Sequence, residues 1–314
     1  MKIAVIDLGT NTFNLLIREL PEGKVLFNDK LSVRLGDGGL NENRISEASF
    51  ERGIRSLKTH VETCRKWEAD EIYAFATSAV RSASNGQDFI KAAWEQTGIR
   101  INLIDGDQEA ELIHLGVQQA LELVPENALI MDIGGGSTEF IIANNQEVHW
   151  KRSYLLGSSR LMQKFQPSDP IKPSEADELK EYFEQELEEL FEAARKHPVR
   201  YLIGSSGSFD TLAAMTAHRF QSPEVLEGQT TYTFDMYEYR VISKLMLESD
   251  FEQRLHTPGM IPMRADLIVL ACVQIDFILN RLGIRAMKLS TYALKEGVLV
   301  TLQNKSHTWQ KSSL

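Results

Sequence analysis

The stretch Asp7-Leu-Gly-Thr-Asn-Thr-Phe-Asn-Leu-Leu-Ile17 occurs twice in this chain in closely similar form. The second copy is Asp132-Ile-Gly-Gly-Gly-Ser-Thr-Glu-Phe-Ile-Ile142, and the two copies align without a gap. Each contains an aspartate after an apolar strand, a glycine turn with small polar residues, and a second apolar strand. Repetition of a strand–turn–strand unit predicts two related domains that face each other. Two unrelated tight hairpins are the alternative, because glycine-rich turns are common.

Strands and helices alternate along the rest of the 314 residues, which is typical of an α/β fold with two domains. Expected strands cover residues 2–7, 15–20, 24–34, 71–76, 100–104, 128–133, 199–203 and 286–289. Expected helices cover residues 46–66, 85–98, 108–123 and a final stretch that begins at Ala293. The repeat suggests a first domain of residues 1–124 plus 298–314, and a second domain of residues 125–297.

Composition and charge favour a protein of the cell interior that does not bind nucleic acid. The formal net charge of −10 opposes non-specific binding to nucleic acid, which requires a basic face. Cys64 and Cys272 both lie in helix-like apolar patterns and are expected to be buried thiols in a reducing compartment. The sequence shows neither a signal-peptide pattern at Met1 nor an apolar run of spanning length. We therefore expect a cytoplasmic protein without a membrane partner.

The two hairpins have the chemistry of a phosphate site. A tight glycine turn directs several backbone N–H groups into one concavity, and short hydroxyl and amide side chains add donors. The candidate phosphate-binding residues are Gly9, Thr10, Asn11, Thr12, Gly134, Gly135, Gly136, Ser137 and Thr138. Asp7 and Asp132 would repel a phosphate, so they are better interpreted as Mg²⁺ ligands. A turn-capping role is the alternative for each aspartate.

Two further motifs point to the same chemistry. Glu109 follows Asp105-Gly-Asp-Gln at the start of an expected helix, where a carboxylate could activate water beside a phosphate. From the residues alone, a first-turn acid stabilised by the helix dipole is the simpler interpretation. Gly204-Ser-Ser-Gly207-Ser208 joins a strand to a helix, an arrangement that favours anions, and Asp210 follows it.

These hairpins and several later blocks resemble the exopolyphosphatase/guanosine pentaphosphate phosphohydrolase family over essentially the whole chain. The other matching blocks are Val33-Arg-Leu-Gly36, Ala76-Thr-Ser-Ala-Val-Arg81, Gln108-Glu-Ala110, Gly157 with Arg160-Leu161, Gly204 to Leu212, Arg264-Ala-Asp266 and Ser290 to Gly297. The resemblance implies the duplicated actin-like ATPase/sugar kinase (ribonuclease H-like) fold with a cleft between two domains. It also implies Mg²⁺-dependent removal of the terminal phosphate from polyphosphate or pppGpp.

The resemblance assigns roles to individual residues. Glu109 falls on the family's catalytic glutamate, and Glu139 is a second acidic candidate, as an auxiliary base or on the metal side. Arg81 resembles a cation for the phosphate chain, with Arg34 as a weaker candidate. Gly204, Gly207 and Ser208 fall on a further phosphate loop. The oligomeric state, with a homodimer among the options, stays open.

Two other functions remain open from the sequence. A slow polyphosphate- or alarmone-binding regulator is favoured by the loss of cations that the family often carries, together with the gain of Glu111 and Asp210. A small-molecule kinase of the same fold is the other alternative. It would be expected to carry an aspartate base and an adenosine pocket, and neither is identifiable in the sequence.

Overall fold

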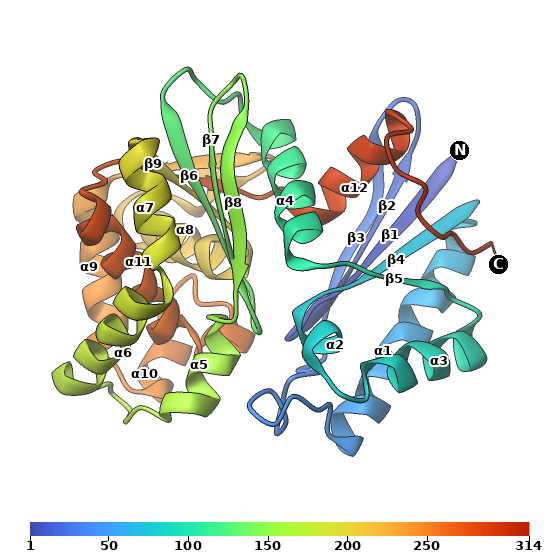
Figure 1. Cartoon of the computed structure of the whole chain (residues 1–314), viewed down its shortest axis with the longest axis horizontal. Coiled ribbons are helices and arrows are strands. Elements are labelled where there is room, and N and C mark those ends of the chain that lie inside the picture. The colour runs from blue at the N-terminus through green and yellow to red at the C-terminus, as the bar shows by residue number, and fades with distance from the viewer. Residues whose placement is uncertain (314) are drawn as a thin grey trace.

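The computed structural model describes residues 1–313 and shows two lobes side by side, each built on one β-sheet (Figure 1). The first lobe contains a five-stranded sheet in the order β3-β2-β1-β4-β5. Its strands are β1 (Lys2–Leu8), β2 (Thr12–Glu19), β3 (Lys24–Ser32), β4 (Glu71–Ala76) and β5 (Ile101–Leu103). Its helices are α1 (Glu47–Lys66), α2 (Ser78–Ser82) and α3 (Gly86–Thr97).

The second lobe contains a six-stranded sheet in the order β10-β11-β9-β6-β7-β8. Its strands are β6 (Asn127–Ile133), β7 (Thr138–Ala143), β8 (Val148–Tyr154), β9 (Val199–Ser205), β10 (Thr231–Phe234) and β11 (Met287–Ser290). Its helices are α5 (Ser158–Phe165), α6 (Pro173–Glu186), α7 (Glu188–Lys196), α8 (Gly207–Phe220), α9 (Met236–Glu248), α10 (Phe251–Leu255) and α11 (Ile268–Leu282). Short 3₁₀ turns η1 (Pro223–Leu226) and η2 (Pro262–Arg264) complete this lobe.

The two sheets share one strand order, so the internal duplication is confirmed. Starting from β8, the second sheet runs β8-β7-β6-β9-β11, which matches β3-β2-β1-β4-β5 strand for strand. In each sheet the first strand pairs antiparallel with the second and parallel with the fourth. The chain therefore has the duplicated α/β fold of actin-like ATPases and sugar kinases. The antiparallel edge strand β10 has no counterpart in the first sheet and is not predicted by the sequence.

Helices α4 (Gly106–Ala120) and α12 (Leu294–Gln303) lie between the two sheets (Figure 1). They cross at two glycines. A Cβ at Gly116 would lie 1.8 Å from the carbonyl oxygen of Ala293, and one at Gly297 would lie 1.8 Å from that of Leu112. Only glycine allows helices to approach so closely. This crossing holds α4 and α12 against each other between the two sheets. The division of the chain at residues 124 and 297 stays a prediction.

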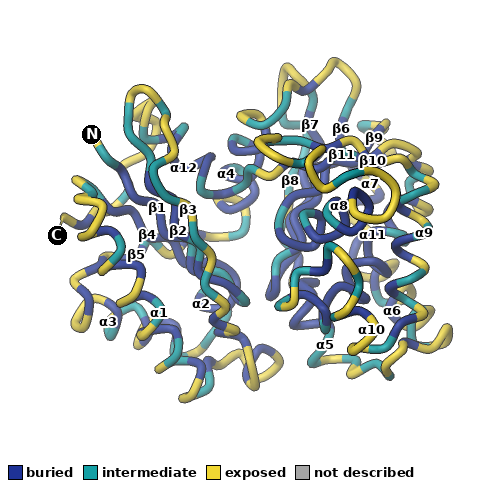
Figure 2. The backbone as a smooth tube through the Cα atoms, turned by 180° about the vertical axis from the view of Figure 1, so that it is seen from behind, coloured by how far each residue is buried: buried dark blue, intermediate teal, exposed yellow. Residues whose placement is uncertain are grey.

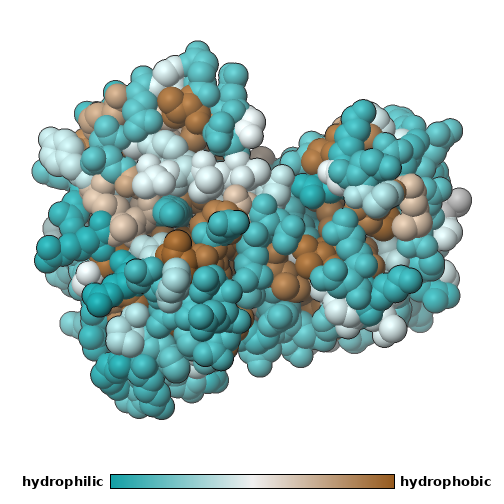
Figure 3. Space-filling view, turned by 90° about the horizontal axis from the view of Figure 1, so that it is seen from above, coloured by the Kyte–Doolittle hydropathy of each residue, from teal (hydrophilic) through white to brown (hydrophobic). Residues whose placement is uncertain are grey.

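Apolar burial ties these layers together. One core fills the second lobe, another lies under α1 and α3, and a third joins both sheets through α4 and α12. The central strands are buried and the peripheral loops are exposed (Figure 2). Seen from above, the molecular surface is indented between the lobes (Figure 3). Cys64 and Cys272 are both buried, as expected. Within residues 1–313, no helix has the length and apolar character needed to cross a bilayer.

Candidate active site

The two glycine hairpins have the same backbone geometry and meet between the lobes. In the first hairpin the N–H of Gly9 donates to the carbonyl of Thr12 at 3.0 Å. In the second, the N–H of Gly134 donates to the carbonyl of Ser137, also at 3.0 Å. A Cβ at Gly135 would lie 2.7 Å from the Asn11 side chain. Glycine at this position therefore lets the second turn approach the first closely.

Each turn has one carbonyl that is bonded by backbone N–H groups of its own lobe. The carbonyl of Asn11 accepts from the N–H groups of Val33 and Arg34, each at 2.8 Å. The carbonyl of Gly135 accepts from Ser159 and Arg160 at the start of α5. With these carbonyls occupied, the turn N–H groups that are not bonded within the hairpins are available to an anion between them.

Side chains from α5 fasten the second lobe to the first. The Ser159 hydroxyl donates to Oδ1 of Asn11 at 2.7 Å. The buried guanidinium of Arg160 donates to the carbonyl of Gly136 in its own lobe and to the carbonyl of Leu40 in the other. Oδ1 of Asn11 is thus already bonded, whereas its Nδ2 is buried without a partner among residues 1–313. That amide nitrogen is a ready donor to an anion.

A cavity of about 130 Å³ lies between the hairpins and contains most of the candidate residues. The predicted site residues that line it are Asp7, Gly9, Thr10, Asn11, Thr12, Glu109, Asp132, Gly134, Gly135, Gly136, Ser137, Glu139 and Gly207. Both halves of the repeat and the start of α4 therefore contribute to one site.

Strand pairing gives each of the two sheets a row of three polar residues, at corresponding positions in the two lobes. In the first lobe, Asp7 stands opposite Asn14 on β2, and Asn14 stands opposite Lys30 on β3. In the second lobe, the same row reads Asp132, Glu139 and Ser153. Nδ2 of Asn14 donates to Oδ2 of Asp7 at 2.9 Å, and the Ser153 hydroxyl donates to Oε1 of Glu139 at 2.6 Å. The second row therefore has an additional acid and lacks the lysine.

Glu109 lies one turn into α4 and points into the cavity. Asp105 and Gln108 cap the helix reciprocally, which fixes its first residue and the direction of Glu109. Nη1 of Arg81 donates to Oε2 of Glu109 at 2.8 Å and to the carbonyl of Ile104 at 3.0 Å. Burial raises the pKa of Glu109 to about 7, although the Arg81 guanidinium opposes the rise. Such a carboxyl changes charge near neutral pH, as a general base should.

Three other carboxyls share this environment. Burial raises the pKa of Asp132 to about 6, and the nearby charge of Asp7 adds to the effect. Burial likewise raises the pKa of Asp7, although Asn14 opposes this. The pKa of Glu139 is raised well above its usual value by burial and by the charges of Glu109 and Asp132. Because Arg81 pairs with Glu109, we expect Glu109 to ionise before Glu139.

These carboxyls fit a divalent cation that retains water. Within residues 1–313, no three Asp, Glu, His or Cys side chains converge to form a complete metal site. Asp7 and Asp132 nevertheless face one cavity from two lobes. Burial raises the pKa of both carboxyls, and a cation beside them would stabilise their ionised forms. Mg²⁺ commonly takes one or two carboxylates and completes its shell with water and phosphate oxygens. The donor set suits that ion.

Four predicted site residues lie elsewhere. Thr138 is the first residue of β7 and lies between Ser137 and Glu139, which line the cavity, so it faces away from the cavity. Its hydroxyl donates to the carbonyl of Leu156. Gly204 lies within β9, where a Cβ would lie 2.0 Å from the ring of Phe209. Ser208 is buried in the first turn of α8, outside the cavity lining. Arg81 contacts Glu109 instead of the cavity itself.

Several cavity residues are not among the predicted site residues, although all but Lys30 lie within the quoted motifs. These residues are Asn14, Lys30, Thr77, Ser78, Ser206, Arg264 and Lys295. Lys30 is signalled only by its alternation with Asn28 and Ser32 on one face of β3. A Cβ at Gly207 would lie 2.3 Å from Nη2 of Arg264, so that glycine makes room for a buried cation. The Ser78 hydroxyl is buried without a partner among the described residues.

The two acids that favoured a slow regulator both have cationic neighbours. Glu111 lies outside the cavity, and its Oε2 lies 2.5 Å from Nζ of Lys151. Asp210 lines the cavity, but Nζ of Lys30 lies 4.0 Å from its Oδ2. The charge of Arg264 also acts on Asp210. Their negative charge is therefore balanced locally, which weakens the argument for a binder without turnover.

Comparison with known proteins gives a consistent result. The model of the Ppx/GppA phosphatase family matches residues 16–306. The crystal structure of an exopolyphosphatase from Cytophaga hutchinsonii is similar, with a TM-score of 0.94 and 39% identity over 97% of this chain and 98% of that one. A Ppx/GppA family member from Aquifex aeolicus has a TM-score of 0.78 at 25% identity, over 98% of this chain and 99% of that one.

A curated relative from Fusobacterium nucleatum is a bifunctional 3-dehydroquinate synthase/phosphatase. It is 30% identical over 294 residues, which cover 89% of this chain and 43% of that protein. The chain thus spans less than half the length of this relative. The family match extends over both lobes and contains the second hairpin, Glu109 and the crossing of α4 with α12. The chain belongs to the Ppx/GppA phosphatase family.

Proposed function

We propose that the protein is a phosphohydrolase that releases the terminal phosphate of inorganic polyphosphate or pppGpp by attack of water. One observation carries the proposal: a buried carboxyl, Glu109, lies in the same cavity as two matching anion-binding turns. The family match and the exopolyphosphatase relative support the choice of substrates. Both substrates end in a phosphoanhydride, so the same turns serve either one.

The turn amides and the free donors of Asn11 and Ser78 would hold the terminal phosphate. Lys30 and Arg264 add positive charge from the walls of the cavity. Mg²⁺ held by Asp7 and Asp132, when bound, supplies positive charge to the phosphate oxygens. Together these groups would fix the phosphorus in front of Glu109.

Glu109 would orient a water molecule and accept one of its protons as the water oxygen bonds to the terminal phosphorus. The bridging P–O bond breaks, and its electron pair stays on the oxygen of the shortened chain. Orthophosphate leaves, and the proton held by Glu109 passes to solvent. Arg81 favours the ionised form of Glu109, which is the form that accepts the proton.

The test is phosphate release by the purified protein from polyphosphate and from pppGpp, with Mg²⁺ and with excess chelator. We expect release from at least one substrate, and loss of release in chelator. Binding of both substrates without release would favour the regulator. Release that requires a small-molecule acceptor, with the phosphate recovered on that acceptor, would favour the kinase.

A further inference from the structure

A second cavity of about 140 Å³ adjoins the candidate active site. The two cavities share Asn11, Thr12 and Arg264 as lining residues. The second is also lined by residues of both lobes, among them Arg34 and Asp266. A ligand that is anchored on the first hairpin and is longer than one phosphate can therefore extend into it.

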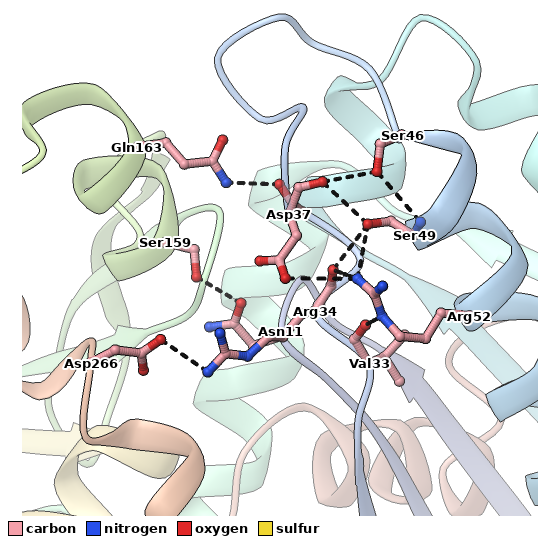
Figure 4. A network of polar contacts seen from close by, with 11 residues as sticks. Asn11, Val33, Arg34, Asp37, Ser46, Ser49, Arg52, Ser159, Gln163 and Asp266 are labelled. Carbon is pink, nitrogen blue, oxygen red and sulfur yellow. Dashed lines mark hydrogen bonds and ion pairs between the residues drawn. The ribbon is translucent and has the colours of Figure 1, made fainter. Parts of the chain in front are cut away.

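An ion pair between the lobes crosses this second cavity. Nη2 of Arg34, which follows β3 in the first lobe, lies 2.9 Å from Oδ2 of Asp266, which follows η2 in the second (Figure 4). Both side chains are partly exposed, at 44% and 29%. An ion pair so open to solvent is weak. A stronger anion can therefore displace the carboxylate at little cost.

The backbone of Arg34 is held firmly even though its ion pair is weak. Its φ of 47° is in the left-handed region, which is uncommon for a residue other than glycine. Its N–H donates to the carbonyl of Asn11 at 2.8 Å, and its own carbonyl accepts from Nη2 of Arg52 at 2.7 Å and from the Ser49 hydroxyl (Figure 4). The backbone of Arg34 is thus fixed next to the first phosphate turn, and its side chain lines the second cavity.

Asp266 has the position of an anion beside the Arg34 guanidinium. Its charge acts on Arg264, two residues earlier, and its Oδ2 contacts Arg34. Its Oδ1 is buried without a partner among the described residues. A carboxylate that pairs with an arginine in this way occupies the place that a phosphate oxygen would take.

We propose that a phosphate group of the substrate displaces the Asp266 carboxylate from Arg34. In the free protein, Asp266 occupies the place of that phosphate. Arg34 is then a specificity residue for the part of the substrate beyond its terminal phosphate. The inference rests on the proposed function. It predicts that Arg34 and Asp266 set the preference for chain length and have no part in the attack of water. It also predicts that Asp266 acts chiefly through Arg34, the guanidinium that it contacts, and only weakly through Arg264.

Binding of long-chain inorganic polyphosphate and of orthophosphate is measured by calorimetry with Mg²⁺, in a Glu109→Gln background that slows turnover. Asp266→Asn should tighten polyphosphate binding up to about fivefold, the upper range for an exposed ion pair. Arg34→Gln should weaken it by about tenfold, because a charge-assisted contact is lost. Orthophosphate affinity should change less than about twofold in both variants, since neither residue lies in the first cavity.

The double variant, Arg34→Gln with Asp266→Asn, distinguishes this proposal from direct repulsion between the Asp266 carboxylate and the polyphosphate. If Asp266 acts chiefly through Arg34, Asp266→Asn should tighten polyphosphate binding much less when Arg34 is already glutamine. Equal tightening in both backgrounds, or unchanged polyphosphate affinity in both single variants, would overturn the inference. Glu184→Gln is the matched control, because it removes the exposed ion pair with Arg281 far from the cavity. Phosphate release by the wild-type protein decides the proposed function separately.

Discussion

Replacing Glu109 with glutamine tests the role of the buried carboxyl. The change preserves size and leaves an oxygen that can accept from Arg81, but it removes the ability to take a proton. With a pKa of about 7, Glu109 is about nine-tenths ionised at pH 8 in the wild-type protein. Loss of a general base typically lowers turnover by about 100-fold or more. We expect that loss in kcat at matched, saturating Mg²⁺, with substrate affinity unchanged or improved.

The same variant should change the pH dependence of activity and stability. Wild-type kcat should fall below pH 7 as Glu109 becomes protonated. The pH–rate profile of Glu109→Gln should lack this decrease on its acidic side. Burial raises the pKa of Glu109, so the folded protein favours its neutral form. This group's contribution to the free energy of unfolding is therefore present below its ordinary pKa of 4.5 and is lost as the pH rises through about 7. Glu109→Gln should therefore unfold at a higher temperature than wild type at pH 8, with a smaller gain at pH 5.

Glu111→Gln is the matched control, since it makes the same change on the same helix, outside the cavity. It should retain wild-type turnover. If Glu109→Gln retained more than about a tenth of wild-type kcat while Glu111→Gln was fully active, the assignment of the base would be wrong. Glu139, the other buried glutamate of the cavity, would then be the next candidate.

Three further predictions follow from individual contacts. Asp132→Asn should raise the Mg²⁺ concentration for half-maximal activity by about tenfold or more, as titration of activity with Mg²⁺ would show; an unchanged titration would argue against a metal role. Gly116→Ala should lower the free energy of unfolding in urea by about 1–3 kcal/mol, because its Cβ would overlap the carbonyl of Ala293; wild-type stability would disprove the tight crossing. Arg81→Gln should move the acidic limb of the pH–rate profile upward, since Arg81 lowers the pKa of Glu109; an unmoved limb would contradict that coupling.

The sequence predicts the fold well because each hairpin is determined locally. An apolar strand, an aspartate and a glycine turn determine both β1–β2 and β6–β7, and their repetition implies the duplication. The alternation of strand residues also explains one wrong assignment. Ser137 and Glu139 face the cavity, so Thr138 between them has to face the core.

The rest of the site depends on how separate elements pack against one another, which local patterns do not encode. Lys30 reaches the cavity because β3 pairs with β2 in one register, and Arg264 does so because Gly207 leaves space for it. The contact between Arg81 and Glu109 joins α2 to α4, which are adjacent only once the helices have packed. Burial then sets the pKa of Glu109, and burial is a property of the assembled lobes.

The central claim is that water attacks the terminal phosphorus in the cavity between the hairpins. Hydrolysis of polyphosphate in ¹⁸O-labelled water, with Mg²⁺, tests it directly by mass analysis of the products. The account predicts that each orthophosphate released in a single turnover carries one solvent oxygen, and that the shortened chain carries none. Label in the shortened chain, or no release of phosphate from either polyphosphate or pppGpp, would contradict it.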